Sequence, residues 1–272
     1  MSGDPSELEE LSRAMGAFYS HHATRGKYQA MVDAEHNALP STESAMRTAI
    51  LARKATSILE VGCGSGRIYR RLRSEGFRGS YTGLEVSPDM VARNTVEHPD
   101  ATWIRGSIYT FDPKISFDVL FAYFVLEHCV YPVKALERMV SLVCPGGVVI
   151  LVFPDFVASG RFASQTLGFA GGRAKECLRR GDLANALINL YDSRVHLPRS
   201  LRRAAEEHGL FPVNLRPRCL IDPEHIEPDV DAVYIASKRE VSDWAVRAGL
   251  TPHFPAGTEG TFRDNTLIEL ET

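Results

Sequence analysis

The 272-residue chain has few cysteines, no long apolar run and no excess of basic side chains. Its five cysteines are scattered without a C-x-x-C pair, which favours free thiols in a reducing compartment over a disulfide framework. No apolar segment approaches the roughly 18 residues of a spanning helix, and the polar, acidic first residues are unlike a signal peptide. We therefore expect a soluble, cytoplasmic protein that does not associate with membranes.

The charge balance also excludes a function class. Lys and Arg number 31 against 34 Asp and Glu, for a net charge of −3. A sequence-independent grip on nucleic acid needs a basic excess, so we expect no nucleic-acid partner. Arg67, Arg70, Arg71 and Arg73 form a local basic cluster, which we interpret as a solvated helix face, with a patch for an anionic partner as the alternative.

What the chain does have is an alternation of apolar and helix-like segments, with 44% hydrophobic residues to supply a core. The apolar segments 57–61, 79–85, 102–105, 118–124 and 148–153 read as strands. Helices are expected at 66–74, from Ser87-Pro88 onward, and at 133–143. This order predicts an α/β fold with a doubly wound, mostly parallel sheet.

The most informative stretch runs from Ile58 to Gly66, where an apolar segment enters a loop with glycine at every second position. Glycine lets a backbone approach a ligand closely, because it has no Cβ. A second apolar segment ends in Glu85, about twenty residues downstream, where an α/β nucleotide site holds a ribose. Together they predict an adenosine-containing cofactor.

The glycine spacing indicates which cofactor. A dinucleotide fingerprint reads G-x-G-x-x-G, but here Arg67 occupies the third glycine's place, which fits a pyrophosphate turn poorly. The form E-x-G-x-G-x-G over residues 60–66 instead resembles the first motif of class I S-adenosylmethionine (SAM) methyltransferases. Four further segments resemble the later motifs of that family in order, at residues 83–87, 105–108, 117–128 and 142–147.

The resemblance implies a Rossmann-like, seven-stranded sheet, with SAM as cofactor and S-adenosylhomocysteine (SAH) as product. It also implies a terminal antiparallel hairpin, for which residues 212–219 and 231–237 are the candidate strands. We divide the chain into an N-terminal helical lid (1–54), a SAM-binding core (55–153) and an inserted cap that lines an acceptor pocket (154–196). A segment with the last helix, expected at 200–208, and the hairpin (197–238) comes next, and a C-terminal extension (239–272) follows.

The resemblance assigns cofactor-binding roles along the motifs. Glu85 accepts hydrogen bonds from the two ribose hydroxyls, and Glu60 anchors the methionine part or only the glycine loop. Ser107 stands where the family often has an acid that contacts adenine, so the Ile108 backbone is expected to help. The complete set expected at the cofactor is Tyr28, Glu60, Gly62, Cys63, Gly64, Gly66, Glu85, Val86, Ser107, Ile108, Ala122 and Tyr123.

His128 is the candidate general base, because a histidine accepts a proton near neutral pH and this one follows the fourth strand. The alternative is that it only shapes the rim of the sheet or touches the cofactor. Tyr19 and His196 are candidate substrate-binding residues, with core packing and structural capping as their respective alternatives. The acidic run over residues 222–231 suggests a metal site, but its prolines favour a solvated loop, and we assign no metal.

Three functions remain open at this point. The first is transfer of a methyl group from SAM to an oxygen or nitrogen of a small molecule. The second is an NAD-dependent oxidoreductase, and the third is a non-catalytic SAM-binding module. The ordered motifs favour the first, while the acceptor and the oligomeric state are not legible in the sequence.

Overall fold

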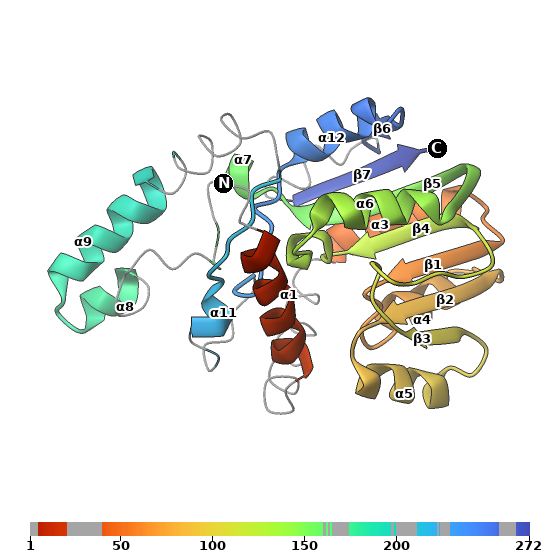
Figure 1. Ribbon diagram of the computed structural model, residues 1–272, viewed down its shortest axis with the longest axis horizontal. Coiled ribbons are helices and arrows are strands. Elements are labelled where there is room, and N and C mark those ends of the chain that lie inside the picture. The colour runs from red at the N-terminus through yellow and green to blue at the C-terminus, as the bar shows by residue number, and fades with distance from the viewer. Residues whose placement is uncertain are drawn as a thin grey trace.

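The computed structural model describes residues 5–20, 40–159, 162, 164, 174–196, 199, 211–221, 223, 229–255 and 265–272. Its centre is a seven-stranded sheet in the order β3-β2-β1-β4-β5-β7-β6 (Figure 1). Strands β1 to β5 are parallel, and β7 runs antiparallel to both β5 and β6. The strands are β1 (Ser57–Val61), β2 (Ser80–Glu85), β3 (Thr102–Arg105), β4 (Phe117–Tyr123), β5 (Val143–Pro154), β6 (Thr251–His253) and β7 (Asn265–Glu271). The predicted fold class is confirmed.

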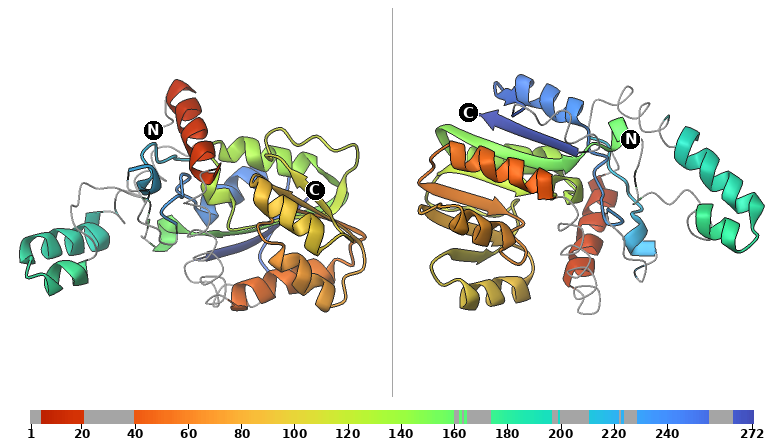
Figure 2. Two further views of the ribbon diagram at one scale, coloured as in Figure 1. Left: turned by 90° about the horizontal axis from the view of Figure 1, so that it is seen from below. Right: turned by 180° about the vertical axis from the view of Figure 1, so that it is seen from behind.

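Helices cover both faces of this sheet, as a parallel sheet buried on two sides requires. Side chains from α6 and α12 join one hydrophobic cluster, and side chains from α3 and α4 join a second on the opposite face (Figure 2). The helices and helical turns are α1 (Pro5–Ser20), α3 (Pro40–Ala52), α4 (Arg67–Ser74), α5 (Pro88–Glu97), η1 (Leu126–His128), α6 (Pro132–Ser141), α7 (Phe156–Ser159), α8 (Ala174–Arg179), α9 (Leu183–Tyr191), η2 (Asp192–His196), α11 (Arg218–Ile221) and α12 (Lys238–Arg247).

Local chemistry explains the element boundaries. Strand β1 is buried over four consecutive residues, the pattern of a central parallel strand. Helices α5 and α6 begin at Pro88 and Pro132, where the missing N–H of proline costs nothing. Gly76, at φ +103°, turns the chain out of α4 and into β2.

The last two strands lie elsewhere than predicted. Residues 212–219 and 231–237 make only one isolated bridge, between Val213 and Tyr234, and the hairpin at the sheet edge is formed by β6 and β7. The segment that begins at Val230 is apolar because it is buried beside η1, where Val233 and Tyr234 donate hydrogen bonds to the Glu127 carbonyl. The helix expected at 200–208 lies outside the described residues.

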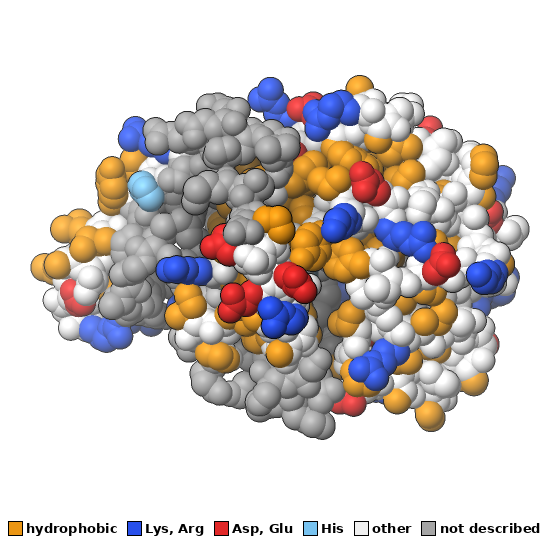
Figure 3. Space-filling model, in the orientation of Figure 1, with side chains coloured by type: hydrophobic (Ala, Val, Ile, Leu, Met, Phe, Trp, Pro, Cys, Tyr) orange, Lys and Arg blue, Asp and Glu red, His pale blue; other side chains and the backbone are white. Residues whose placement is uncertain are grey.

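The helices α8 and α9 lie away from the sheet in each view (Figures 1 and 2). Leu183, Leu187 and Tyr191 of α9 are exposed, so these side chains do not pack on the core. Over the described part of the chain, no helix combines the length and the apolar character that crossing a bilayer demands. On the face drawn in Figure 3, basic and acidic side chains are interspersed, as the small net charge suggests.

Candidate functional site

A cavity of about 460 Å³ opens at the carboxyl ends of β1 to β4. In doubly wound sheets this end is where ligands bind. Its walls come from the loops that follow β1, β2, β3 and β4, and from Asp229. The N-terminal helix α1 supplies another wall through Met15, Phe18 and Tyr19, so the cavity lies between the sheet and this helix.

The glycine loop lines one side of the cavity, and two of its glycines, Gly62 and Gly66, leave no room for a side chain. Gly62 adopts φ +71°, and a Cβ there would stand 2.5 Å from Val125 Cγ2. Gly66 adopts φ +70°, with Trp103 2.9 Å from where its Cβ would lie. Gly64 has open space instead, and its backbone faces the cavity unobstructed. The loop is thereby shaped to bring backbone N–H groups and the start of α4 close to a ligand.

Glu85 ends β2 and lines the cavity with its carboxylate held at both oxygens. Gly64 N–H donates to Oε2 at 3.0 Å, and Ser87 N–H donates to Oε1 at 2.9 Å. Burial raises the pKa of Glu85, and these backbone hydrogen bonds oppose the rise. Each oxygen keeps a lone pair for a ligand hydroxyl, so the carboxylate is preorganised for a diol.

Glu60 and Cys63 also line the cavity, but both are almost fully buried. Tyr81 O–H donates a hydrogen bond to Glu60 Oε2, which ties the end of β1 to β2. Burial raises the pKa of Glu60 well above its usual range, against the charge of Arg67. Burial likewise raises the pKa of the Cys63 thiol, so this thiol stays neutral and unreactive.

The loops after β2 and β3 form the end of the cavity that the resemblance assigns to adenosine. Val86, Ser107 and Ile108, which the resemblance assigns to the cofactor, all line it. The Ser107 hydroxyl accepts the Tyr109 N–H at 3.3 Å, and Gly106 N–H donates to the Glu85 carbonyl at 3.0 Å. The structure thus places the predicted ribose and adenine residues beside one another.

His128 lies on the other side of the glycine loop, in η1 after β4. Its Nδ1 is 3.3 Å from Asp231 Oδ2, and Tyr19 O–H donates to that same oxygen at 2.7 Å. Burial alone would lower the pKa of His128, but the charges of Asp231, Glu127 and Asp229 outweigh it and raise the pKa. The imidazole is therefore a stronger base than a free histidine.

Some predicted residues are not at the cavity. Ala122 is buried inside β4, paired with Val61 and Leu151, and does not line it. His196 ends η2 and does not line it either, whereas Tyr123 and Tyr19 do. Tyr28 lies outside the described residues.

The wall expected from the cap, residues 154–196, is provided by α1 among the described residues. The described cap helices α8 and α9 stand apart from the sheet, which is why they contribute nothing to this cavity (Figure 1).

Several residues at the site had not been predicted from the sequence. Asn94 of α5 is fully buried, and its Nδ2 donates a hydrogen bond to the Gly64 carbonyl at 2.8 Å. This bond holds the glycine loop against α5. Phe124 lines the cavity at φ +53°, a strained conformation that turns the chain from β4 into η1. Glu127, Asp229 and Asp231 gather around His128. The acidic run had been interpreted as solvated, yet Asp231 is fully buried.

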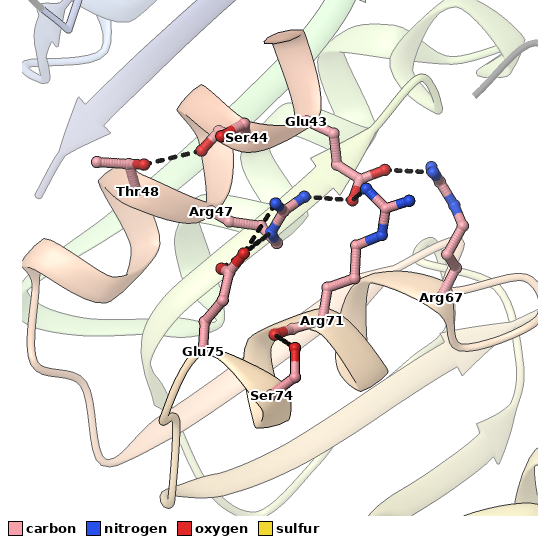
Figure 4. A network of polar contacts seen from close by, with 8 residues as sticks. All are labelled: Glu43, Ser44, Arg47, Thr48, Arg67, Arg71, Ser74 and Glu75. Atoms are coloured by element: carbon pink, nitrogen blue, oxygen red, sulfur yellow. Dashed lines mark hydrogen bonds and ion pairs between the residues drawn. The ribbon is translucent and has the colours of Figure 1, made fainter. Parts of the chain in front are cut away.

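The arginine cluster is only partly a solvated face, because Arg67 and Arg71 pair with a buried acid whereas Arg70 is exposed. Glu43 of α3 is fully buried and forms ion pairs with Arg47, Arg67 and Arg71 (Figure 4). Arg47 also pairs with Glu75 at 2.8 Å. The hydrophobic pattern of α4 gave no hint of Glu43, because a buried acid on another helix leaves no local signal. The network fixes Arg67, which lines the cavity, at the start of α4.

The comparisons with known proteins agree with this geometry. Residues 59–149 match the family model described as a methyltransferase domain. A dTDP-3-amino-3,6-dideoxy-alpha-D-glucopyranose N,N-dimethyltransferase of Streptomyces fradiae is 35% identical over 126 residues, covering 44% of this chain and 48% of the relative. A trans-aconitate 2-methyltransferase of Rhodopseudomonas palustris is 29% identical over 98 residues, covering 36% and 38%. The matches thus span less than half of these curated relatives.

Among solved structures, DhpI in complex with SAH resembles this chain with a TM-score of 0.54 at 15% identity, over 96% of both chains. At that identity the likeness concerns the fold alone. The family match and the relatives agree with the resemblance that the five motifs carry: residues 59–149 match a methyltransferase domain, and both relatives are named as methyltransferases.

Proposed function

We propose that this protein transfers a methyl group from SAM to an oxygen or nitrogen of a small-molecule acceptor. The observation that carries the proposal is the pairing of Glu85 with the glycine loop at the mouth of one cavity, through the Gly64 N–H. That pairing fits an adenosine ligand, because a fixed carboxylate faces the position of a ribose beside an unobstructed backbone.

The residues present suit SAM. All of the following residues line the cavity: Glu85 would bind the ribose, Ser107 and Ile108 would border the adenine, and the glycine loop with Glu60 would border the methionine portion. When bound there, SAM supplies an activated methyl group, so the protein's task is to position the acceptor and exclude water. Helix α1 forms one wall of the cavity and would help to exclude water.

His128 acts as the general base that removes a proton from the acceptor. Its Nδ1 faces Asp231, which leaves Nε2 as the nitrogen for proton transfer. Asp231 stabilises the charged imidazolium, and Tyr19 holds Asp231 in place.

The curated relatives support a small-molecule acceptor. One is named for an amino sugar nucleotide and another for trans-aconitate. The acceptor pocket proposed here is the part of the cavity between α1 and the loop after β4, where Phe18, Tyr19 and Phe124 supply apolar contact.

Calorimetric titration tests the cofactor, and release of SAH in the presence of candidate acceptors tests the transfer. We expect SAM to bind and SAH to compete with it. We also expect His128→Ala to lower turnover while leaving SAM affinity nearly unchanged, because the imidazole serves the acceptor. Absence of binding heat with SAM and SAH contradicts the proposed function, and unchanged turnover in His128→Ala removes this residue as the base.

A further inference from the structure

A cluster of carboxylates surrounds His128 at the acceptor end of the cavity. Glu127 and Asp229 line the cavity, and Asp231 lies behind the imidazole. Glu127 is fully buried, with a side-chain exposure of 0%, yet neither of its oxygens accepts a hydrogen bond from the residues that the structure describes. Its nearest described charge is His128 Nε2, 3.9 Å away. A buried carboxylate without hydrogen bonds destabilises the folded protein unless a ligand supplies hydrogen-bond donors.

The rest of the cavity wall does not balance this charge. Among the described residues that line it, the acids Glu60, Glu85, Glu127 and Asp229 face only Arg67 and His128 as basic side chains. Arg67 is paired with the buried Glu43. Glu60 and Glu85 sit at the glycine loop and accept hydrogen bonds from Tyr81 and from backbone N–H groups, which leaves Glu127 and Asp229 for the acceptor.

Resting on the proposed function, we infer that the acceptor is a cationic amine, whose ammonium group binds between Glu127 and Asp229 beside His128. Ammonium N–H groups would donate to the unpartnered Glu127 oxygens, the charge-assisted bonds that this site lacks. The rings of Phe18 and Tyr19 line the same cavity and suit the apolar body of an organic cation. An acceptor that carries carboxylates would meet like charge at this end instead.

The ionisation of the cluster fits this assignment. Burial raises the pKa of Glu127 to about 8 and that of Asp229 to about 6. A bound cation would lower both pKa values, because it favours the charged carboxylates. His128, flanked by these acids, takes a proton from the ammonium and leaves the neutral amine that a nucleophile must be.

The test uses the full chain saturated with SAH, and benzylamine as the probe, with benzyl alcohol and benzoate as its neutral and anionic counterparts. Alkylamines are protonated near neutral pH, so the three probes differ in charge at nearly constant shape. Calorimetry should give benzylamine an affinity about tenfold or more above that of benzyl alcohol, with benzoate weaker than both.

Glu127→Gln keeps the shape of the side chain and removes its charge, so it should reduce the amine preference to about threefold or less without changing SAH affinity by more than about threefold. Asp229→Asn is a second variant with the same expectation, and the exposed Glu137→Gln is the matched control that keeps the preference.

Equal binding of benzylamine and benzyl alcohol overturns the inference, as does an undiminished preference in both variants. A large loss of SAH affinity in Glu127→Gln also overturns it, because the cluster would then hold the ammonium of the cofactor. Failure of the unmodified chain to bind SAH is a different result, since it overturns the proposed function itself.

Discussion

Glu85 joins two loops as well as facing the cavity, because its oxygens accept the N–H groups of Gly64 and Ser87. Glu85→Ala removes both anchors and the acceptors for a ribose. We expect it to weaken SAH binding by more than tenfold, or about 1.4 kcal/mol, in a calorimetric titration. Glu137→Ala, on the exposed face of α6, is the control. Near-normal binding by the Glu85 variant contradicts the assigned role.

Asp231 is a positioning residue, since it acts through His128. Its carboxylate is the first of the neighbouring charges that raise the pKa of the imidazole. In Asp231→Asn we expect the His128 pKa to fall, measured by nuclear magnetic resonance titration of the ring protons. The acidic limb of the turnover profile should move to lower pH with it, because the base then loses its proton more easily. A purely structural role for Asp231 leaves the His128 pKa where it is.

At the scale of elements, the Glu43 network joins α3 to α4, the helix that follows the glycine loop (Figure 4). Glu43→Ala leaves Arg47 and Arg67 largely buried without their shared partner. Breaking a buried pair from one side costs about 3 kcal/mol, which denaturant unfolding will detect. Arg93→Ala, which removes an exposed pair with Glu97 on α5, should leave stability unchanged. Equal effects of the two substitutions contradict the structural importance of the network.

The helix α1 forms one wall of the cavity through Met15, Phe18 and Tyr19, so a ligand inside should restrain it. We expect SAH to slow hydrogen exchange of amides in residues 5–20 and in the glycine loop, measured by mass spectrometry. Peptides from α12 and β6 line no part of this cavity and serve as the internal control. Unchanged exchange in α1 upon SAH binding contradicts its role as a cover.

Elements with strong local signals were predictable from the sequence. Strands β1 and β3 lie at the predicted residues, because a short apolar run with turn signals on both sides is typical of a strand. Strand β7 was missed, since its apolar pattern is interrupted by Glu269, which pairs with Arg53. The buried segment after Val230 was mistaken for a strand, because burial beside η1 gives the same composition. Long-range contacts of this kind leave no periodic trace.

The residues of the candidate site also fall into those that a local sequence pattern predicts and those that only the fold brings together. Glu85 and the glycine loop follow from spacing within one motif, so the sequence is sufficient to find them. The partners of His128 come from α1 and from a segment about one hundred residues further on, which only the fold brings together. Glu127 adjoins His128 in the sequence, but only the three-dimensional structure reveals that no described residue donates a hydrogen bond to its carboxylate.

The whole molecule combines several ionisable groups whose pKa values rise on folding. Burial raises the pKa of Glu127, Asp229, Glu60 and Glu85, and neighbouring carboxylates raise that of His128. In each case the folded state binds protons more tightly than the unfolded chain. The contribution of these groups to stability is thus fully present below their pKa values in the unfolded chain. It is lost as the pH rises through their higher pKa values in the folded protein.

We therefore expect the free energy of unfolding to fall as the pH is raised from about 5 to about 8. The carboxyl groups with lowered pKa values, such as Asp118, titrate below this window and do not oppose the trend. Glu127→Gln should make the free energy of unfolding less dependent on pH, because a neutral amide needs no proton to remain buried. The stability of this variant relative to the unmodified chain should therefore increase toward pH 8. Denaturant unfolding at several pH values measures both effects, with Glu137→Gln as the exposed control. A stability that rises across this range, or an unaltered slope in the Glu127 variant, contradicts the raised pKa of that buried carboxyl.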